Sequence, residues 1–277
     1  MKVYFPDDRY ETPADTHVSP WGRLLGGCRW VYYFPYFGIV LRASSLARRG
    51  VYDDCAWAES SIDVVRLIER HGGCFDIRGL DHVRNAAGSG PFVFIANHMS
   101  TLETHVLPVL IVQFMPVTFV VKEKLVAGNM FGPVMRSRDP ITVGRKNPRE
   151  DLDAVLNGGA ERLGRGVSII VFPQSTRSPV FRPEAFNTLG VKLASKAGVP
   201  VIPVAIKSDF WGEGGLFRGF GPIRPERTIH FEFGAPIRVD GRGKEQHLQI
   251  VEFIQSRLRS WGAEEPGAPA ARTQGPR

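Results

Sequence analysis

The stretch FVFIANHMSTLETHVLP, residues 92–108, joins an apolar run to a polar turn and then to a segment of helical character. The run FVFIA (92–96) has the length and β-branched content of a buried strand, and His98 follows it. A helix is predicted to begin at the Ser-Thr pair after the turn, because hydroxyl residues cap helix N-termini and Glu103 adds an acid to the first turn. The stretch therefore predicts a strand that leads directly into a helix.

The alternation of strand and helix continues toward the C-terminus. Short β-branched runs predict strands, and apolar residues at helical spacing predict the helices between them. The further predicted strands are 118–122, 141–143, 168–172, 201–206 and 228–233, and the predicted helices are 102–115, 149–164, 185–197 and 244–260. This order predicts an α/β fold, with a mostly parallel or mixed central sheet flanked by helices.

The composition favours one catalytic domain with appendages and an anionic partner. The chain has 277 residues, of which 43% are hydrophobic and 23% charged, and its formal net charge is +7. Lipid headgroups, a phosphorylated substrate and an acidic carrier protein all suit this charge. The basic residues are spread along the chain and form no nucleic-acid-binding motif, so we expect no nucleic acid partner.

The cysteines and the N-terminus indicate the compartment. Cys28, Cys55 and Cys74 are too few and too widely spaced for a disulfide framework, and their odd number leaves one unpaired. The first 20 residues lack the basic start and the apolar run of a secretory signal. We therefore expect a reducing compartment and, given the basic charge, association with the cytoplasmic face of a membrane.

An apolar stretch at 30–41 predicts how the chain meets that membrane. It is interrupted by Pro35 and falls short of the roughly 20 apolar residues that span a bilayer. It is rich in aromatic residues and is followed by arginines: Trp30, Tyr32, Tyr33 and Tyr36, then Arg42, Arg48 and Arg49. This pattern predicts an interfacial anchor with its aromatic rings at the lipid headgroups. The alternative is a buried core helix of a soluble protein.

Three regions follow from these patterns. Residues 1–73 are predicted to form an N-terminal helical, membrane-associating region, which includes a connecting helix between Asp53 and His71. Residues 74–260 are predicted to form the catalytic domain. The tail, 261–277, is rich in Pro, Gly and Ala and is predicted to be disordered.

The chemistry is predicted to centre on His98 and Glu103. The carboxylate lies one short turn after the ring, where it can accept a hydrogen bond from one ring nitrogen and leave the other as a general base. A capping glutamate beside a structural histidine is the alternative reading of this pair. His105 does not share one helical face with the other two residues in the manner of a metalloprotease site, so we expect no metal.

Two later segments add cations. Residues 119–151 contain Lys122 and Arg145 together with Gly132, and residues 168–186 place Arg177 in a polar loop directly after a buried strand. Guanidinium groups suit phosphate, and open α/β sheets bind ligands at the carboxyl ends of their strands. A solvated basic face is the alternative for the first of these segments.

In this order, the segments resemble the conserved blocks of the glycerolipid acyltransferase family, which includes the 1-acylglycerol-3-phosphate acyltransferases. The resemblance covers roughly residues 75–235. The matching positions are Asn97, His98 and Glu103 in the first block, Lys122, Gly132 and Arg145 in the second, Phe172, Pro173, Gln174, Ser175, Thr176 and Arg177 in the third, and 199–206 with Pro203 in the fourth.

The resemblance implies acyl transfer without a covalent enzyme intermediate and without a bound cofactor. His98, oriented by Glu103, would deprotonate the hydroxyl of a lysophospholipid, which would attack the thioester of acyl-CoA or acyl carrier protein. The simplest such reaction converts 1-acylglycerol-3-phosphate to phosphatidic acid. Arg145 and Arg177, assisted by Lys122, would hold the acceptor phosphate.

Three positions depart from the family pattern. Glu103 replaces the usual Asp, Gln174 replaces Glu and Ser175 replaces Gly. The longer side chain of Glu103 changes how the carboxylate must reach His98, and the other two changes suggest a different lysolipid acceptor, such as an amino-acid-based one. A lipid-binding pseudoenzyme is a further alternative. A lipid hydrolase is disfavoured, because the chain lacks the Gly-x-Ser-x-Gly elbow.

Overall fold

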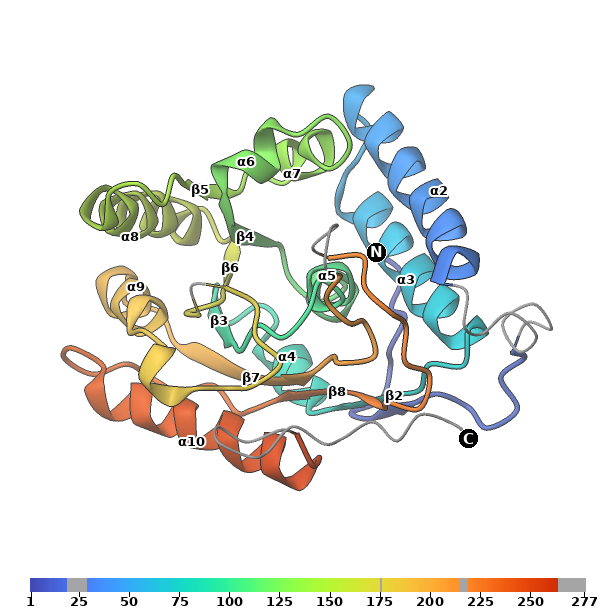
Figure 1. The fold of residues 1–277 in the computed structure, drawn as a ribbon. Coiled ribbons are helices and arrows are strands. Elements are labelled where there is room, and N and C mark those ends of the chain that lie inside the picture. The colour runs from blue at the N-terminus through green and yellow to red at the C-terminus, as the bar shows by residue number, and fades with distance from the viewer. Residues whose placement is uncertain (19–28, 175, 215–218, 264–277) are drawn as a thin grey trace.

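A single mixed sheet organises the chain. The computed structural model describes residues 1–18, 29–174, 176–214 and 219–263. The sheet order is β1-β2-β8-β7-β3-β6-β4-β5, and β3 occupies a central place (Figure 1). The strands are β1 (Tyr10–Glu11), β2 (Phe75–Arg78), β3 (Val93–Ala96), β4 (Val117–Lys122), β5 (Ile141–Val143), β6 (Ser168–Val171), β7 (Val201–Lys207) and β8 (Ile229–Phe233).

Strand direction divides the sheet in two. Strands β7, β3, β6, β4 and β5 are mutually parallel, so their carboxyl ends lie at one edge. Strand β8 pairs antiparallel with β7 and parallel with β2, and β1 pairs antiparallel with β2. The predicted α/β fold with a mostly parallel or mixed sheet is confirmed.

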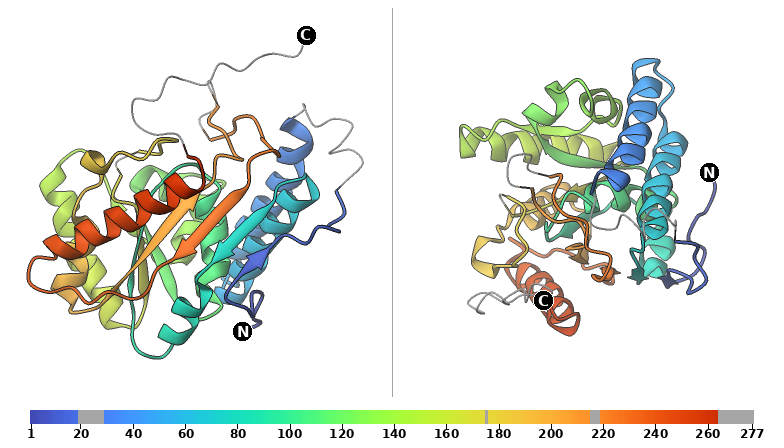
Figure 2. Two further views of the ribbon diagram at one scale, coloured as in Figure 1. Left: turned by 90° about the horizontal axis from the view of Figure 1, so that it is seen from below. Right: turned by 45° about the vertical axis from the view of Figure 1, so that its right-hand side comes forward.

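Helices cover both faces of this sheet. They are α2 (Arg29–Arg48), α3 (Asp54–Arg70), α4 (Leu80–Ala86), α5 (Glu103–Val112), α6 (Glu123–Ala127), α7 (Gly132–Ser137), α8 (Pro148–Gly164), α9 (Leu189–Ala197) and α10 (Lys244–Ser260), with a 3₁₀ turn at Pro183–Ala185. Helix α10 runs along one face, whereas α2 and α3 lie on the other side of the molecule (Figures 1 and 2).

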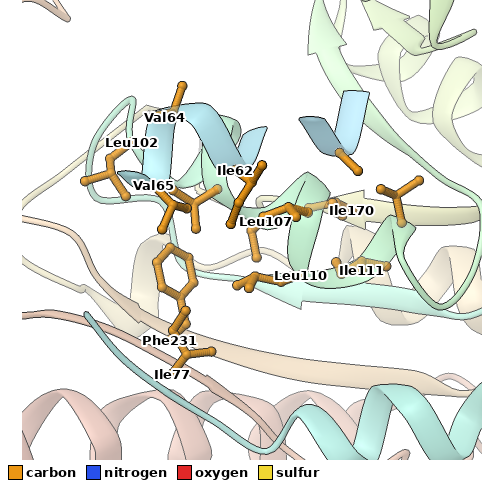
Figure 3. Packing of buried hydrophobic residues seen from close by; sticks show 14 of the residues in the cluster. Ile62, Val64, Val65, Ile77, Leu102, Leu107, Leu110, Ile111, Ile170 and Phe231 are labelled. Carbon is orange, nitrogen blue, oxygen red and sulfur yellow. The ribbon is translucent and has the colours of Figure 1, made fainter. Parts of the chain in front are cut away.

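The pleat of the strands explains how one sheet carries two cores. In β3, Val93 and Ile95 pack with residues of α8, α9 and α10, while Phe94 and Ala96 belong to the core beneath α3 and α5. Successive side chains of a strand point to opposite faces, so an uninterrupted apolar run is what a strand buried on both faces requires. Figure 3 shows the second core, where Val65 of α3 and Leu107 of α5 lie close together above Phe231 of β8.

Helix α2 packs onto the rest of the protein through the tyrosines that the sequence places at a membrane surface. Tyr32, Tyr33 and Tyr36 are buried, and the Tyr36 ring contacts Trp211 with centroids 5.1 Å apart. The Tyr33 hydroxyl donates to the Gly221 carbonyl at 2.8 Å. The prediction that these three rings lie at the headgroups is therefore wrong, because they find aromatic partners in the chain itself; the alternative, a core helix, describes this face.

The opposite face of α2 is exposed and apolar. Trp30, Phe34 and Leu41 are 45%, 73% and 59% exposed. No helix in the described ranges is long and apolar enough to cross a membrane. The core that holds α2 and α3 continues into β2, α5 and β8, so residues 29–73 fold onto the same sheet as the rest of the chain. Most of the predicted tail, from residue 264 onward, lies outside the described residues.

Candidate active site

His98 lies at the carboxyl end of β3, in the turn that joins this strand to α5. Asn97 anchors the turn to the neighbouring strand: its Nδ2 donates to the Ile206 carbonyl at 2.7 Å, and its Oδ1 accepts from the Ile206 N–H at 2.8 Å. The two bonds extend the β3–β7 ladder by one side chain. Asn97 therefore positions His98 through the backbone and is itself buried.

Glu103 holds the imidazole ring of His98. The Nδ1 atom of His98 lies 2.9 Å from Oε1 of Glu103. The same oxygen accepts from the backbone N–H groups of Met99 at 2.6 Å and Ser100 at 2.8 Å. Glu103 thus reaches back across the first turn of α5 and orders the loop that carries His98.

The ionisation of Glu103 determines the tautomer of His98. Burial of the fully enclosed carboxyl raises its pKa, but the hydrogen bonds from His98 and Ser208 outweigh burial, and the pKa lies below its ordinary value. An ionised carboxylate only accepts hydrogen bonds, so Nδ1 of His98 must donate. The other nitrogen, Nε2, is then left with its lone pair as the basic atom.

Three residues of the loop after β6 also contact His98. The ring of Phe172 stacks on the imidazole with centroids 4.2 Å apart and planes inclined by 18°. The Oε1 atom of Gln174 accepts from the backbone N–H of His98 at 2.6 Å, and the Ser178 N–H donates to the His98 carbonyl at 2.9 Å. Because an amide oxygen accepts as a carboxylate oxygen does, glutamine can fill this place.

His98 opens into a cavity of about 1030 Å³. From one side, α2, α3, α6 and α7 line it with apolar side chains, including Val40, Trp57, Leu125, Val134 and Met135. From the other side, α8 and α9 contribute Asp151 and Lys192 together with the apolar Leu152, Val155 and Leu189. Apolar and charged side chains thus share the wall around His98, as a binding site for an amphiphile would require.

The predicted cations lie around this cavity. Lys122, Arg145 and Arg177 all line it, together with Phe172, Pro173, Gln174 and Thr176 of the third segment. Arg145 has a positive φ of 58°, and Asp151 holds its turn by accepting from the Gly144 and Arg145 N–H groups at 2.9 Å each. The guanidinium group of Arg177 donates a hydrogen bond to the Thr101 hydroxyl. Its Nε atom lies 3.8 Å from Oε1 of Glu213.

His105, which the sequence offered as a metal candidate, is a neutral member of the cavity wall. Burial lowers its pKa to about 4. Its Nε2 lies 2.9 Å from the Tyr36 hydroxyl, which ties α5 to α2. In the described ranges no three histidine, cysteine, aspartate or glutamate side chains are grouped as metal ligands would be.

Comparison with known proteins identifies the domain that contains this site. Residues 74–207 match the family model described as Acyltransferase. The chain is 28% identical over 209 residues to the 1-acyl-sn-glycerol-3-phosphate acyltransferase of Pseudomonas aeruginosa, which covers 75% of this chain and 74% of that protein. Residues 74–207 thus form an acyltransferase domain, and the family and these relatives indicate an O-acyltransferase.

Two further similarities bear on this acyltransferase. It is 27% identical over 179 residues to the lyso-ornithine lipid O-acyltransferase of Pseudomonas aeruginosa, which covers 60% of this chain and 66% of that protein. Its fold is similar to the crystal structure of the 1-acyl-sn-glycerophosphate (LPA) acyltransferase PlsC from Thermotoga maritima, with a TM-score of 0.58, 19% identity and coverage of 86% of this chain and 99% of that one.

Two predicted site residues of the acyltransferase have structural contacts instead. A Cβ atom on Gly132 would come within 2.5 Å of the Val126 carbonyl, so glycine here allows α7 to approach α6. Pro203 lies within β7, and its carbonyl accepts from Gly234, just past the end of β8. Pro203 lies between the Val204–Phe233 pair and the Val201–Ile237 bridge, where regular pairing is interrupted and a residue without an N–H is tolerated. Ser175 lies outside the described residues.

Sequence reasoning missed three polar residues of the site. Thr101 contacts Arg177, Lys192 enters the cavity wall from α9, and Ser208 contacts Glu103. Each lies far along the sequence from the site residues that it approaches, so no local spacing indicated it. For Ser208 a signal did exist, because it is the first polar residue after a buried strand whose carboxyl end faces the site.

Proposed function

We propose that this acyltransferase moves a fatty acyl group from acyl-CoA or acyl carrier protein to the free hydroxyl of a lysophospholipid. The simplest acceptor is 1-acylglycerol-3-phosphate, which would become phosphatidic acid. The observation that carries the proposal is the His98–Glu103 pair, joined at 2.9 Å, in a cavity whose wall has many apolar side chains and also the cations Lys122, Arg145 and Arg177.

The reaction needs one base and no protein nucleophile. Nε2 of His98 takes the proton of the acceptor hydroxyl as its oxygen attacks the thioester carbonyl, and a tetrahedral intermediate forms. The C–S bond then breaks, and the thiolate leaves with the proton that His98 returns. Ionised Glu103 stabilises the imidazolium between these steps. General base catalysis of this kind contributes about 10²–10⁴-fold in rate.

The apolar and the cationic residues of the cavity wall suit the two parts of a lysophospholipid. An acyl chain gains roughly 0.8 kcal/mol for each CH₂ group that it buries, which favours the apolar side beside Trp57 and Val134. Lys122, Arg145 and Arg177 would bind the phosphate, because guanidinium groups bind phosphate oxygens through paired hydrogen bonds.

Such an acceptor remains in a bilayer, so the protein should meet the membrane surface. The exposed side chains of Trp30, Phe34 and Leu41 recur at intervals of four and seven residues along α2 and thus share one helical face. Arg42 lies beside them with 67% of its side chain exposed. We propose that this face rests on an anionic membrane surface at the cytoplasmic side.

A second candidate acceptor is an amino-acid-based lysolipid. The similarity to a lyso-ornithine lipid O-acyltransferase favours it, as does the acidic Glu213 near Arg177. Such an acceptor carries a cationic amine in place of a phosphate, and a carboxylate would bind the amine.

A transfer assay tests the proposal and separates these acceptors. Purified protein is incubated with radiolabelled acyl-CoA, or acyl carrier protein, and vesicles that contain either 1-acylglycerol-3-phosphate, a zwitterionic lysolipid or lyso-ornithine lipid, beside the His98→Ala variant. We expect label in one acylated product for the wild type and none above background for the variant. Absence of transfer to every acceptor would leave a lipid-binding protein, and equal transfer by both proteins would exclude His98 as the base.

A further inference from the structure

We propose that Ser208 is a positioning residue for the catalytic pair: its hydroxyl holds the second carboxylate oxygen of Glu103, so that the first can engage His98. The inference rests on the proposed function of His98 and Glu103. It also connects β7, which contains most of the fourth block (199–206), to the proposed chemistry. Ser208 is the first residue after β7 and is fully buried.

The two oxygens of Glu103 are held by different parts of the chain. All the donors to Oε1 come from the adjacent loop: the His98 ring and the Met99 and Ser100 N–H groups. The donors to Oε2 are hydroxyls, from Ser208 at 2.6 Å and Ser100 at 2.9 Å. Ser208 is the long-range contact, 105 residues along the chain from Glu103.

Ser208 is better placed than Ser100 to hold Oε2. The two hydroxyl oxygens lie 2.9 Å apart, and each carries one proton, so they also compete as donors to one another. Ser100 Oγ additionally accepts from the Leu102 N–H at 3.1 Å and lies farther from Oε2. Ser208, with the shorter contact, therefore supplies the hydrogen bond that fixes Oε2.

A glutamate at position 103 needs such a contact more than an aspartate would. Glutamate has one more rotatable bond, and its terminal torsion is broad, so donors to one oxygen leave the carboxylate plane poorly defined. A carboxylate oxygen offers only about two lone pairs, and Oε1 serves three donors. The orientation of the plane must therefore be set by a contact to the other oxygen, and Ser208 supplies that contact through Oε2.

The experiment measures kcat/KM for acyl transfer across pH for the full chain, with wild type, Ser208→Ala, Ser208→Thr and a control, Ser44→Ala. Ser44 is a buried serine of α2 whose hydroxyl has no hydrogen-bond partner in the structure. We expect Ser208→Ala to lower kcat/KM about 10- to 100-fold, the loss associated with small errors in catalytic geometry. Ser208→Thr keeps the hydroxyl and should restore most of the rate, and Ser44→Ala should match the wild type.

The pH profile separates positioning from a general loss of folded protein, because its shape does not depend on how much enzyme is active. A carboxylate that loses a donor binds protons more tightly and accepts more strongly from His98, so the acid limb should move to higher pH. His105, a second histidine within electrostatic reach of Glu103, has a pKa of about 4 and lies below that limb. An acid limb identical to that of the wild type would overturn the inference.

A second comparison uses Glu103→Asp. The shorter carboxylate withdraws from Ser208, so adding Ser208→Ala to Glu103→Asp should change kcat/KM by less than about twofold. An equal loss in both backgrounds would overturn the inference. These outcomes are distinct from failure of the proposed function, which would show as no transfer by the wild type or as full transfer by His98→Ala.

Discussion

The imidazole of His98 is held from three directions. Glu103 binds Nδ1, Phe172 covers one ring face, and Gln174 accepts from the backbone N–H. These contacts come from two different segments, α5 and the loop after β6, so the position of the proposed base depends on the fold of this edge of the sheet. If His98 acts as the proposed base, a ring already fixed in this way loses little entropy when the substrate binds, which favours proton transfer.

Arg177 is expected to affect acceptor binding and not donor binding. It lines the cavity beside Thr101, where a phosphate would lie. Removal of a charge-assisted hydrogen bond costs roughly 1.5–3 kcal/mol, so Arg177→Ala should raise the acceptor KM by about 10-fold or more. Steady-state kinetics with each substrate varied in turn measure this. Arg182→Ala, an exposed arginine of the same loop, is the control; an unchanged acceptor KM for Arg177→Ala would remove that residue from the phosphate site.

Local spacing was enough to pair His98 with Glu103 but not to find what supports the pair. The two residues are five apart, and a strand that leads into a helix brings them together. Gln174 and Ser208 join the site through contacts across the sheet, 76 and 105 residues away, which no local pattern encodes. Gln174, which suggested a different acceptor, lines the cavity, and its side-chain oxygen accepts from the backbone N–H of His98.

Helix α2 has two apolar faces with different partners. The tyrosine face packs on α5 and on the segment after β7, while Trp30 and Phe34 point away from the protein. A sequence shows that both faces are apolar but not which one the chain itself covers. For this reason the prediction of membrane contact is wrong for the three tyrosines. For the exposed face of α2 it stays a prediction.

The exposed face of α2 is expected to bind vesicles. A triple variant, Trp30→Ala, Phe34→Ala and Leu41→Ala, should lose vesicle binding by several-fold or more, because each buried large side chain contributes roughly 1.5–3 kcal/mol. Co-sedimentation with vesicles that contain anionic lipid measures the bound fraction. Leu248→Ala removes a similarly exposed leucine from α10, on the other side of the sheet, and should not change binding. Equal binding by all three proteins would contradict the proposed membrane face.

The strands and long helices were predicted closely, and the short elements were not. Strand β5 and helix α10 have the predicted bounds, because β-branched runs and amphipathic spacing are strong local signals. Strand β2 (FDIR) and helix α6 (EKLVA) are too short to show periodicity, and their structure depends on neighbours in the sheet and in the cavity wall.

The N-terminal helices share one core with helix α5, which carries the proposed catalytic residue Glu103. The core beneath α3 and α5 runs from Phe5 to Phe233, and the His105–Tyr36 hydrogen bond crosses it between α5 and α2. The cavity wall therefore forms only when the N-terminal helices are in place. Stability of the whole molecule and the shape of the site are coupled through this buried pair.

His105 is expected to make stability depend on pH. Its pKa is lowered by burial from 6.5 to about 4, so below pH 6.5 the unfolded chain binds a proton that the folded chain does not. The free energy of unfolding should therefore decrease as the pH is lowered, by roughly 2 kcal/mol between pH 7 and pH 5. His105→Gln keeps a polar partner for Tyr36 and should fall less over the same interval. Urea unfolding at both pH values measures this; parallel losses in the two proteins would refute the assignment.

The pairing of His98 with Glu103 is tested most directly by a double-mutant cycle in the transfer assay, with His98→Ala, Glu103→Gln and the double variant compared at equal amounts of folded protein. Loss of the base should lower kcat by about 10²–10⁴-fold. Since the two residues act as a unit, the double variant should lose no more than His98→Ala alone. A wild-type rate in His98→Ala, or a double loss equal to the product of the two single losses, would contradict a base oriented by Glu103.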